Sequence, residues 1–190
     1  MIQILTMKNM TNAKQEQFDR QYLRMAFIWS ENSYAIRRKV GCIIVKDNRI
    51  ISDGYNGTPS GFPNVCEYGI QTESLVSSLG ATNTTKDREY MKKLMYEGYK
   101  LVTYPYVLHA EANAITKLAR GGGIGSDGAT IYITDSPCIE CAKMIIQAGI
   151  RRVVYAREYR ITDSLDLLRN AGIEIIHIAE NDLKETNEEI

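Results

Sequence analysis

The sequence predicts an α/β domain of three layers, in which helices cover both faces of one mixed five-stranded sheet. Two strand-like runs joined by a short turn stand early in the chain. After them, strand-like and helix-like runs alternate up to residue 178, which is typical of a sheet with partly parallel strands. The 190 residues suffice for one sizeable core, so we expect residues 1–190 to form a single domain.

The first helix is predicted from apolar side chains at helical spacing. Phe18, Tyr22, Met25 and Trp29 recur three or four residues apart, which places them on one face. We therefore expect a helix from about Gln15 to Asn32, with this face against the sheet.

Two strands and a loop follow. Val40–Val45 and Ile50–Ser52 read as strands, and the turn-forming residues Asp47-Asn48-Arg49 join them in a hairpin. The run Gly54–Gly61 is too rich in glycine and proline to continue a strand, so we expect a shaped loop there.

The second half alternates between helices and strands, and a glycine run ends the first of these helices. The expected elements are a helix over 109–120, a strand at Ala129–Thr134, a helix at Cys138–Ala148, a strand at Arg152–Ala156, a helix at Asp163–Asn170 and a strand at Ile173–Ile178.

Charge and cysteine content limit the possible functions. The 23 basic and 23 acidic residues cancel, so the balance indicates neither a nucleic-acid-binding nor a membrane-surface protein. Met1–Met10 has neither a signal-peptide layout nor the length of a membrane span. Four cysteines provide no disulfide framework, so we expect a reducing, cytoplasmic location.

The motif that carries chemistry is His109-Ala110-Glu111, followed by Pro137-Cys138-Ile139-Glu140-Cys141. One histidine and two cysteines give zinc three protein ligands and leave a position for water, which is a catalytic arrangement. We predict His109, Cys138 and Cys141 as the ligands. The two cysteines, three residues apart, suit the first turn of a helix, where the helix dipole favours thiolates.

Glu111 is the candidate proton carrier. Two thiolates cancel the charge of zinc, so bound water is less acidified than at an all-histidine site and a nearby base is useful. Residues two apart on a helix point to different sides. We therefore expect His109 at the mouth of the helix, with Glu111 free of the metal.

The two cysteines also permit other interpretations. A C-x-x-C pair alone is also typical of a redox site or of half a structural zinc site. A closed structural site would need a fourth ligand from Cys42, Cys66 or His177, but Cys42 and His177 lie in apolar, strand-like runs. The His-x-Glu sequence favours catalysis.

These motifs resemble those of the deoxycytidylate deaminases, the branch of the cytidine deaminase superfamily that acts on free dCMP. The signature H-x-E followed by P-C-x-x-C is that of the zinc nucleobase deaminases. The matching passages, which span about residues 18–178, are the glycine-rich loop Gly54–Gly61, the lead-in Tyr104–Val107, the zinc helix His109–Ile115, and Cys138–Lys143 with Gln147–Ile150. The length and the insertion at about 67–106 are similar to bacteriophage and eukaryotic members.

The resemblance implies a cytidine deaminase-like fold and hydrolysis of dCMP to dUMP, which supplies thymidylate synthesis. Glu111 would move protons, backbone groups at Ala110 and Ser136 would hold the pyrimidine, and Asn56 would contact the sugar or ring. Alternatively, Asn56 only shapes a turn. For the phosphate, the candidates are Arg38, Lys39 and Tyr155.

The resemblance also implies regulation. It predicts a homohexamer activated by dCTP and inhibited by dTTP, each bound with Mg²⁺ near Gly54, Tyr55 and Gly57. Arg120 ends the helix that carries Glu111, which suits either an effector-linked role or simply a favourable cation at a helix C-terminus. The location would be the host cytoplasm if the protein is viral.

Two segments stand apart. Within the insertion, which we place beside the active site, Gln71–Thr85 is polar and Lys86–Tyr99 has helical character. Between the glycine-rich loop and His109, Cys66 is the one obvious ligand for the second zinc of some relatives, so we expect no second zinc and interpret Cys66 as a vestige of that site or, more simply, as a buried thiol. The acidic run Asn181–Ile190 predicts a loosely held tail.

Three alternative functions stay open. A polynucleotide deaminase acting on tRNA or single-stranded DNA shares the zinc residues but normally needs a basic stripe. A nucleoside deaminase would lack a phosphate pocket. A non-catalytic, zinc-stabilised module would leave Glu111 without a role.

Overall fold

The structure is a computed structural model that describes residues 2–70, 89, 100–121, 124–158 and 163–183, with side chains from residue 13 onward. Five strands form the main sheet in the order β2-β1-β5-β6-β7. Strand β1 is antiparallel to both β2 and β5, whereas β5, β6 and β7 are parallel, so the predicted mixed sheet is confirmed. The strands are β1 (Gly41–Lys46), β2 (Arg49–Tyr55), β5 (Thr130–Asp135), β6 (Arg152–Arg157) and β7 (Glu174–His177).

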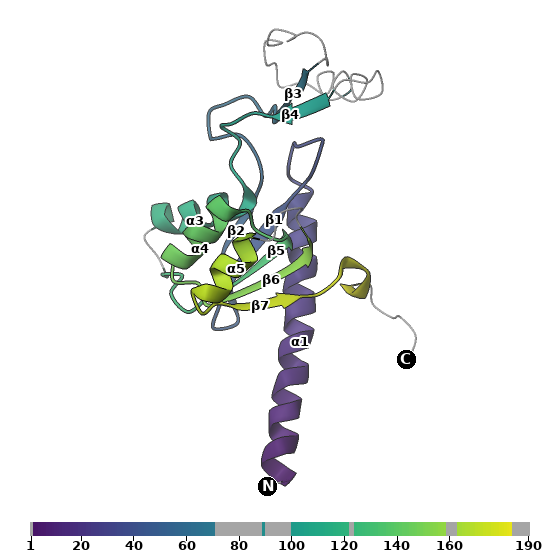
Figure 1. Ribbon diagram of the computed structural model, residues 1–190, viewed down its shortest axis with the longest axis vertical. Helices are drawn as coiled ribbons and strands as arrows, with labels where there is room; N and C mark the ends of the chain where they lie inside the picture. The colour runs from purple at the N-terminus through teal and green to yellow at the C-terminus, as the bar shows by residue number, and fades with distance from the viewer. Residues whose placement is uncertain (1, 71–88, 90–99, 122–123, 159–162, 184–190) are drawn as a thin grey trace.

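Helices cover both faces of this sheet (Figure 1). In β1, Cys42 and Ile44 point toward a core shared with three helices, and Ile43 and Val45 point toward a second core on the opposite face. The first core is covered by α3 (Ala110–Gly121), α4 (Ile139–Gln147) and α5 (Asp163–Asn170), and the second by α1 (Ile2–Ser30) and the short helix η1 (Glu180–Leu183). The predicted three layers are confirmed.

Helix α1 differs from its prediction in extent and in buried face. It begins at Ile2, well before Gln15, and its buried positions include Asp19, Leu23 and Ala26. Met25 and Trp29 are 40% and 38% exposed, so the expectation that they face the sheet was wrong. Among the described residues, no helix combines the length and apolar character that a membrane span requires.

A buried, paired carboxylate accounts for the buried face of α1. The Asp19 carboxylate accepts two hydrogen bonds from Arg152 (2.7 and 2.6 Å) and one from the Tyr132 hydroxyl (2.8 Å). A carboxylate that is paired and hydrogen-bonded in this way can lie in a protein interior. Its partners are more than 100 residues away, so the local pattern of α1 does not reveal them.

The hairpin β1–β2 is confirmed, with a two-residue turn. Asp47 and Asn48 have φ values of 50° and 58°, as a type I′ turn requires. Strand β2 continues to Tyr55, so the loop begins later than predicted. Gly54 lies where β2 meets α3, and a Cβ there would stand 2.2 Å from the carbonyl oxygen of Ala110. Glycine therefore permits this close packing.

The remaining predicted elements begin and end within one residue of their expected positions. The insertion adds a separate antiparallel pair, β3 (Glu67–Ile70) and β4 (Lys100–Thr103), which was not predicted. Figure 1 shows this pair beyond the C-terminal end of α1. The expectations for Gln71–Thr85 and most of Lys86–Tyr99 lie outside the described residues.

The tail is held at its start. Residues 180–183 form η1, and Leu183, which is 8% exposed, packs in the core beneath α1. The prediction of a loose tail was therefore wrong for 181–183, because an apolar side chain anchors it. Residues 184–190 lie outside the described part of the chain.

Candidate active site

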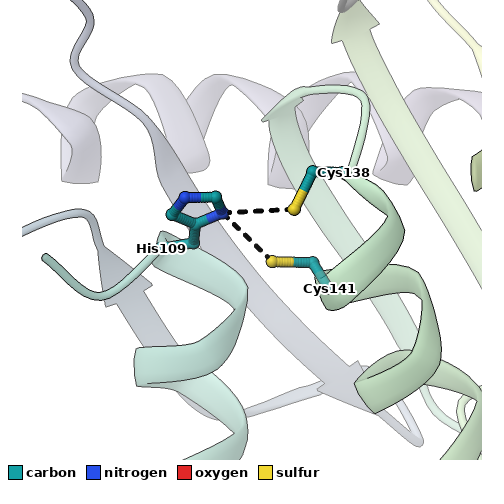
Figure 2. A group of neighbouring side chains, drawn as sticks. All are labelled: His109, Cys138 and Cys141. Carbon is teal, nitrogen blue, oxygen red and sulfur yellow. Dashed lines mark hydrogen bonds between the residues drawn. The ribbon is translucent and has the colours of Figure 1, made fainter. Parts of the chain in front are cut away.

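The three predicted metal ligands meet between the starts of two helices. The ligand atoms of His109, Cys138 and Cys141 all lie within 4.8 Å of one another. His109 Nδ1 is 3.4 Å from the sulfur of Cys138 and 3.3 Å from that of Cys141. Figure 2 shows the ring pointing toward both sulfurs. One imidazole and two thiols form a donor set that suits zinc.

Local structure explains how each ligand reaches this point. The His109 carbonyl accepts the first hydrogen bond of α3, from Asn113 N at 3.0 Å, so the histidine side chain leaves from the mouth of the helix as predicted. Cys138 is the N-cap residue of α4, and Cys141 lies in its first turn. Neither position requires a distortion of the helix.

The electrostatics of the cysteine pair favour a thiolate. A hydrogen bond from the Cys141 thiol, followed by one from His109, lowers the pKa of Cys138 to about 3. The same bond to Cys138, together with burial, raises the pKa of Cys141, and the bond to Cys138 raises that of His109. One sulfur is thus held as a thiolate, the form that ligates metals.

Glu111 lies beside these ligands but is not one of the three. Glu111 is 4% exposed, and burial raises the pKa of its carboxyl to about 7. A carboxyl that titrates near neutrality can both take up and release a proton. The predicted separation between ligand and proton carrier therefore matches the geometry.

A cavity of about 420 Å³ opens onto this group. Its walls come from the segment before β1, the end of β2, the base of the insertion, the ends of β5 and β6, and the starts of α3 and α4. The lining residues are Arg37, Arg38, Val40, Asn56, Glu67, Thr103, Val107, His109, Ala110, Glu111, Asp135, Ser136, Cys138 and Glu158.

The predicted substrate residues divide into two groups. Asn56, Ala110, Ser136 and Arg38 line the cavity, but Lys39 and Tyr155 do not. Lys39 directs its Nζ to the carbonyl oxygen of Glu31, at 2.7 Å. Tyr155 is 3% exposed, because its position in β6 turns it into the core shared with α3, α4 and α5. The structure therefore does not bring these two phosphate candidates to the site.

Asn56 has a clear structural role. Its Nδ2 donates to the carbonyl oxygen of Arg38 at 2.9 Å, and its Oδ1 accepts from Val40 N at 2.8 Å. These bonds match the alternative in which Asn56 shapes the chain. Since the residue also lines the cavity, contact with a substrate stays a proposal.

The glycine loop is less open to an effector phosphate than expected. Gly54 is buried against α3. The amide of Gly57 already donates to Leu108 O at 3.1 Å, which removes it as a phosphate donor. Tyr55 accepts a hydrogen bond from Asn113 Nδ2 through its carbonyl oxygen. Arg120 is exposed in the last turn of α3, where it suits the helix dipole.

The candidate fourth ligands lie outside the group of three. Cys42 is fully buried in the core, and Cys66 is 2% exposed and packs with Ala35 and Val107. His177 stacks on Tyr155, with ring centroids 4.9 Å apart.

Sequence reasoning missed several residues of the cavity wall. Asp135, 5% exposed, accepts from Arg38 Nε at 2.7 Å and from Arg157 Nη2 at 2.6 Å. In the sequence, its position directly before the predicted substrate residue Ser136 could have identified it. Glu67 and Thr103 stand at the two ends of the insertion, and no local pattern pairs them. Arg37 adjoins Arg38 in the basic run before β1, and Glu158 follows the end of β6.

Comparison with known proteins identifies similar chains. The family model described as the cytidine and deoxycytidylate deaminase zinc-binding region matches residues 16–157. Deoxycytidylate deaminase of Enterobacteria phage T4 is 36% identical over 182 residues, covering 87% of this chain and 92% of its own. The Saccharomyces cerevisiae deoxycytidylate deaminase is 31% identical over 169 residues, covering 88% and 47%.

A solved structure of a dCMP deaminase is also similar to this chain. The dCMP deaminase of cyanophage S-TIM5, in complex with dCMP and dUMP, is 36% identical to this chain. The two structures superpose with a TM-score of 0.65 over 85% of this chain and 97% of the cyanophage chain.

Proposed function

The chain belongs to the cytidine and deoxycytidylate deaminase family, and from this premise we propose that it is a zinc-dependent enzyme that hydrolyses dCMP to dUMP. The observation that carries the proposal is the single cavity shared by His109, Cys138 and Glu111, with Cys141 completing the ligand group. We assign the three ligands to zinc, which when bound polarises a water molecule for attack.

Glu111 moves the protons of this reaction. Water adds to C4 of the cytosine ring while the Glu111 carboxylate accepts a proton and passes it to N3. The second water proton is carried in the same way to the amino group, which leaves as ammonia, and C4 keeps the oxygen as a carbonyl.

Other cavity residues orient the nucleotide. We assign the backbone at Ala110 and Ser136 to the pyrimidine and Asn56 to the sugar, since all three line the cavity. Arg38, joined by Arg37, is assigned to the 5′-phosphate, because guanidinium groups bind phosphates through charge-assisted hydrogen bonds. Asp135 holds the Arg38 guanidinium in place.

The first prediction concerns the 5′-phosphate. Without it, Arg37 and Arg38 lose the charge-assisted bonds to phosphate and keep only those to Thr103 and Asp135, so kcat/KM for deoxycytidine should be about 10³-fold lower than for dCMP. Steady-state assays of dCMP, deoxycytidine, dCTP and a cytosine-containing single strand test this. Comparable values for dCMP and deoxycytidine would assign the chain to the nucleoside deaminases, and preference for the single strand would indicate a polynucleotide deaminase.

We also propose that the enzyme supplies dUMP for thymidylate synthesis in the cytoplasm and is regulated as a homohexamer by Mg²⁺-bound dCTP and dTTP. Family resemblance supports this. Exposed Met25, Ile28 and Trp29 on α1 provide an apolar surface that subunit contacts would cover. Arg120 lies on the helix that carries Glu111, so a shift of that helix would reach the active site.

The second prediction follows from this regulation. Two effectors act in opposite directions only if they favour different conformations. dCTP should therefore make the dCMP saturation curve less sigmoidal and dTTP more so, and light scattering should give a mass of about six chains, as a closed hexamer requires. A monomer with hyperbolic kinetics, unaffected by either triphosphate, would remove the regulation while leaving the deaminase proposal intact.

A further inference from the structure

The arginines of the cavity stand on a segment without regular secondary structure. Residues 34–40, here called the arginine segment, lie between α1 and β1 and belong to no helix or strand. They present Arg37 and Arg38 to the cavity. Helix or strand hydrogen bonds do not fix this backbone, so other contacts hold it, among them the bonds of Asn56 to Arg38 O and Val40 N.

Glu67, the first residue of β3, is one of these anchors. Its carboxylate is the acceptor for two consecutive amides: Oε1 lies 3.1 Å from Ile36 N and 3.3 Å from Arg37 N, and Oε2 lies 3.2 Å from Ile36 N. Glu67 is 2% exposed and lines the cavity. The buried Glu67 carboxylate therefore binds the backbone at Ile36 and Arg37, directly before Arg38.

Thr103 holds the other end of Arg37. It is the direct partner of Glu67 across the β3–β4 pair. Its hydroxyl accepts a hydrogen bond from Arg37 Nη1 at 3.2 Å. One cross-strand pair therefore holds both the backbone and the guanidinium of Arg37, and both members of the pair line the cavity.

This arrangement carries an energetic cost. Burial raises the pKa of Glu67, which shows that the protein destabilises the carboxylate by enclosing it. A neutral side chain of the same size would fill the space without that penalty. What the carboxylate adds is a charged acceptor for two amides, which restricts the arginine segment before a ligand arrives.

Building on the proposed function, we propose that Glu67, together with Thr103, is a positioning residue that orients Arg37 and Arg38 toward the 5′-phosphate. The base of the insertion thereby determines the preference for a nucleotide over a nucleoside. Glu67 and Thr103 act through the arginines, so their effect is confined to substrates that carry a phosphate.

The test compares two substrates across matched variants. Glu67→Gln loses the charge and leaves one oxygen acceptor, Thr103→Val loses the hydroxyl at nearly constant volume, and Thr103→Ser restores it. We expect Glu67→Gln and Thr103→Val each to lower kcat/KM for dCMP about 10-fold, mainly through KM. The deoxycytidine value should change by no more than about two-fold, and Thr103→Ser should recover the dCMP value.

Controls separate positioning from folding. Glu16→Gln removes a carboxylate from an exposed ion pair on α1 and should leave both substrates unaffected. Thermal melts and zinc content are measured for every variant. Thr103→Val, at a half-buried position on β4, keeps the proposal testable if Glu67→Gln fails to fold.

Each outcome decides the question. If kcat/KM falls equally for dCMP and deoxycytidine, Glu67 and Thr103 support the whole site. If it falls for neither substrate, the arginine segment does not need them. Either result overturns the inference. If the wild-type enzyme prefers dCMP and every variant keeps that preference, only this inference fails. If the wild-type enzyme shows no preference, the proposed phosphate recognition fails first and removes the basis of the inference.

Discussion

Replacement of Glu111 by glutamine is expected to lower kcat for dCMP by about 10²- to 10⁴-fold, the range that general acid–base groups contribute. The amide has nearly the same shape but cannot accept the water proton or return it to the ring. The protein should fold normally and keep about one zinc per chain, because Glu111 is not one of the three clustered ligands. Turnover and metal content, measured on the same sample, check both parts.

A matched control is available on the neighbouring helix. Glu140 lies between the two cysteines in the sequence, but its side chain is 70% exposed and pairs with Lys143. Glu140→Gln should therefore leave turnover close to the wild-type value. Near-normal activity in Glu111→Gln would show that another group carries the protons, whereas loss of zinc in that variant would make Glu111 part of the metal site.

Removal of a single ligand should abolish both zinc binding and deamination. His109→Ala leaves two sulfur donors, and Cys138→Ser replaces a thiolate by a hydroxyl, which is a poor zinc ligand at neutral pH. After dialysis, metal analysis should find about one zinc per chain in the wild type and little or none in either variant. The loss of activity should follow the loss of metal.

Cys66→Ala serves as the control for deleting a thiol. Cys66 is buried with Ala35 and Val107, outside the ligand group. This variant should keep its zinc, although its stability should fall because a buried side chain is shortened. Two zincs in the wild type, one of them lost in Cys66→Ala, would reveal a second metal site. Full zinc retention in Cys138→Ser would contradict the proposed ligand set.

The metal site could be predicted from sequence because its geometry is local. His109 directly precedes α3, and Cys138 and Cys141 share the first turn of α4, so the start of each helix places the ligands. The separation of Glu111 from the ligand group follows from the same helix geometry. The alternation of strands and helices also determined the layers of the fold, because each sheet face needs an apolar covering.

The orientation of several side chains in the folded protein depends on partners that are distant in the sequence. Asp19 is buried because Arg152 and Tyr132 bind it from the face of the sheet that α1 covers, and Met25 then points outward although its apolar character favoured the core. Tyr155 looked available for a phosphate, but strand pairing and alternation place it in the core under α3, α4 and α5.

By itself, the sequence predicted the strands of the main sheet and the helices that cover it, the group of three candidate metal ligands and the proposed proton carrier, because helix starts and short spacings specify them. The tertiary structure decided which further residues join Arg38, Asn56, Ala110 and Ser136 in the cavity wall. Glu67 and Thr103 meet only when β3 and β4 pair, and together they hold Arg37, some 30 to 66 residues away. Contacts across such separations depend on how the chain packs in three dimensions, and neither spacing nor composition encodes them locally.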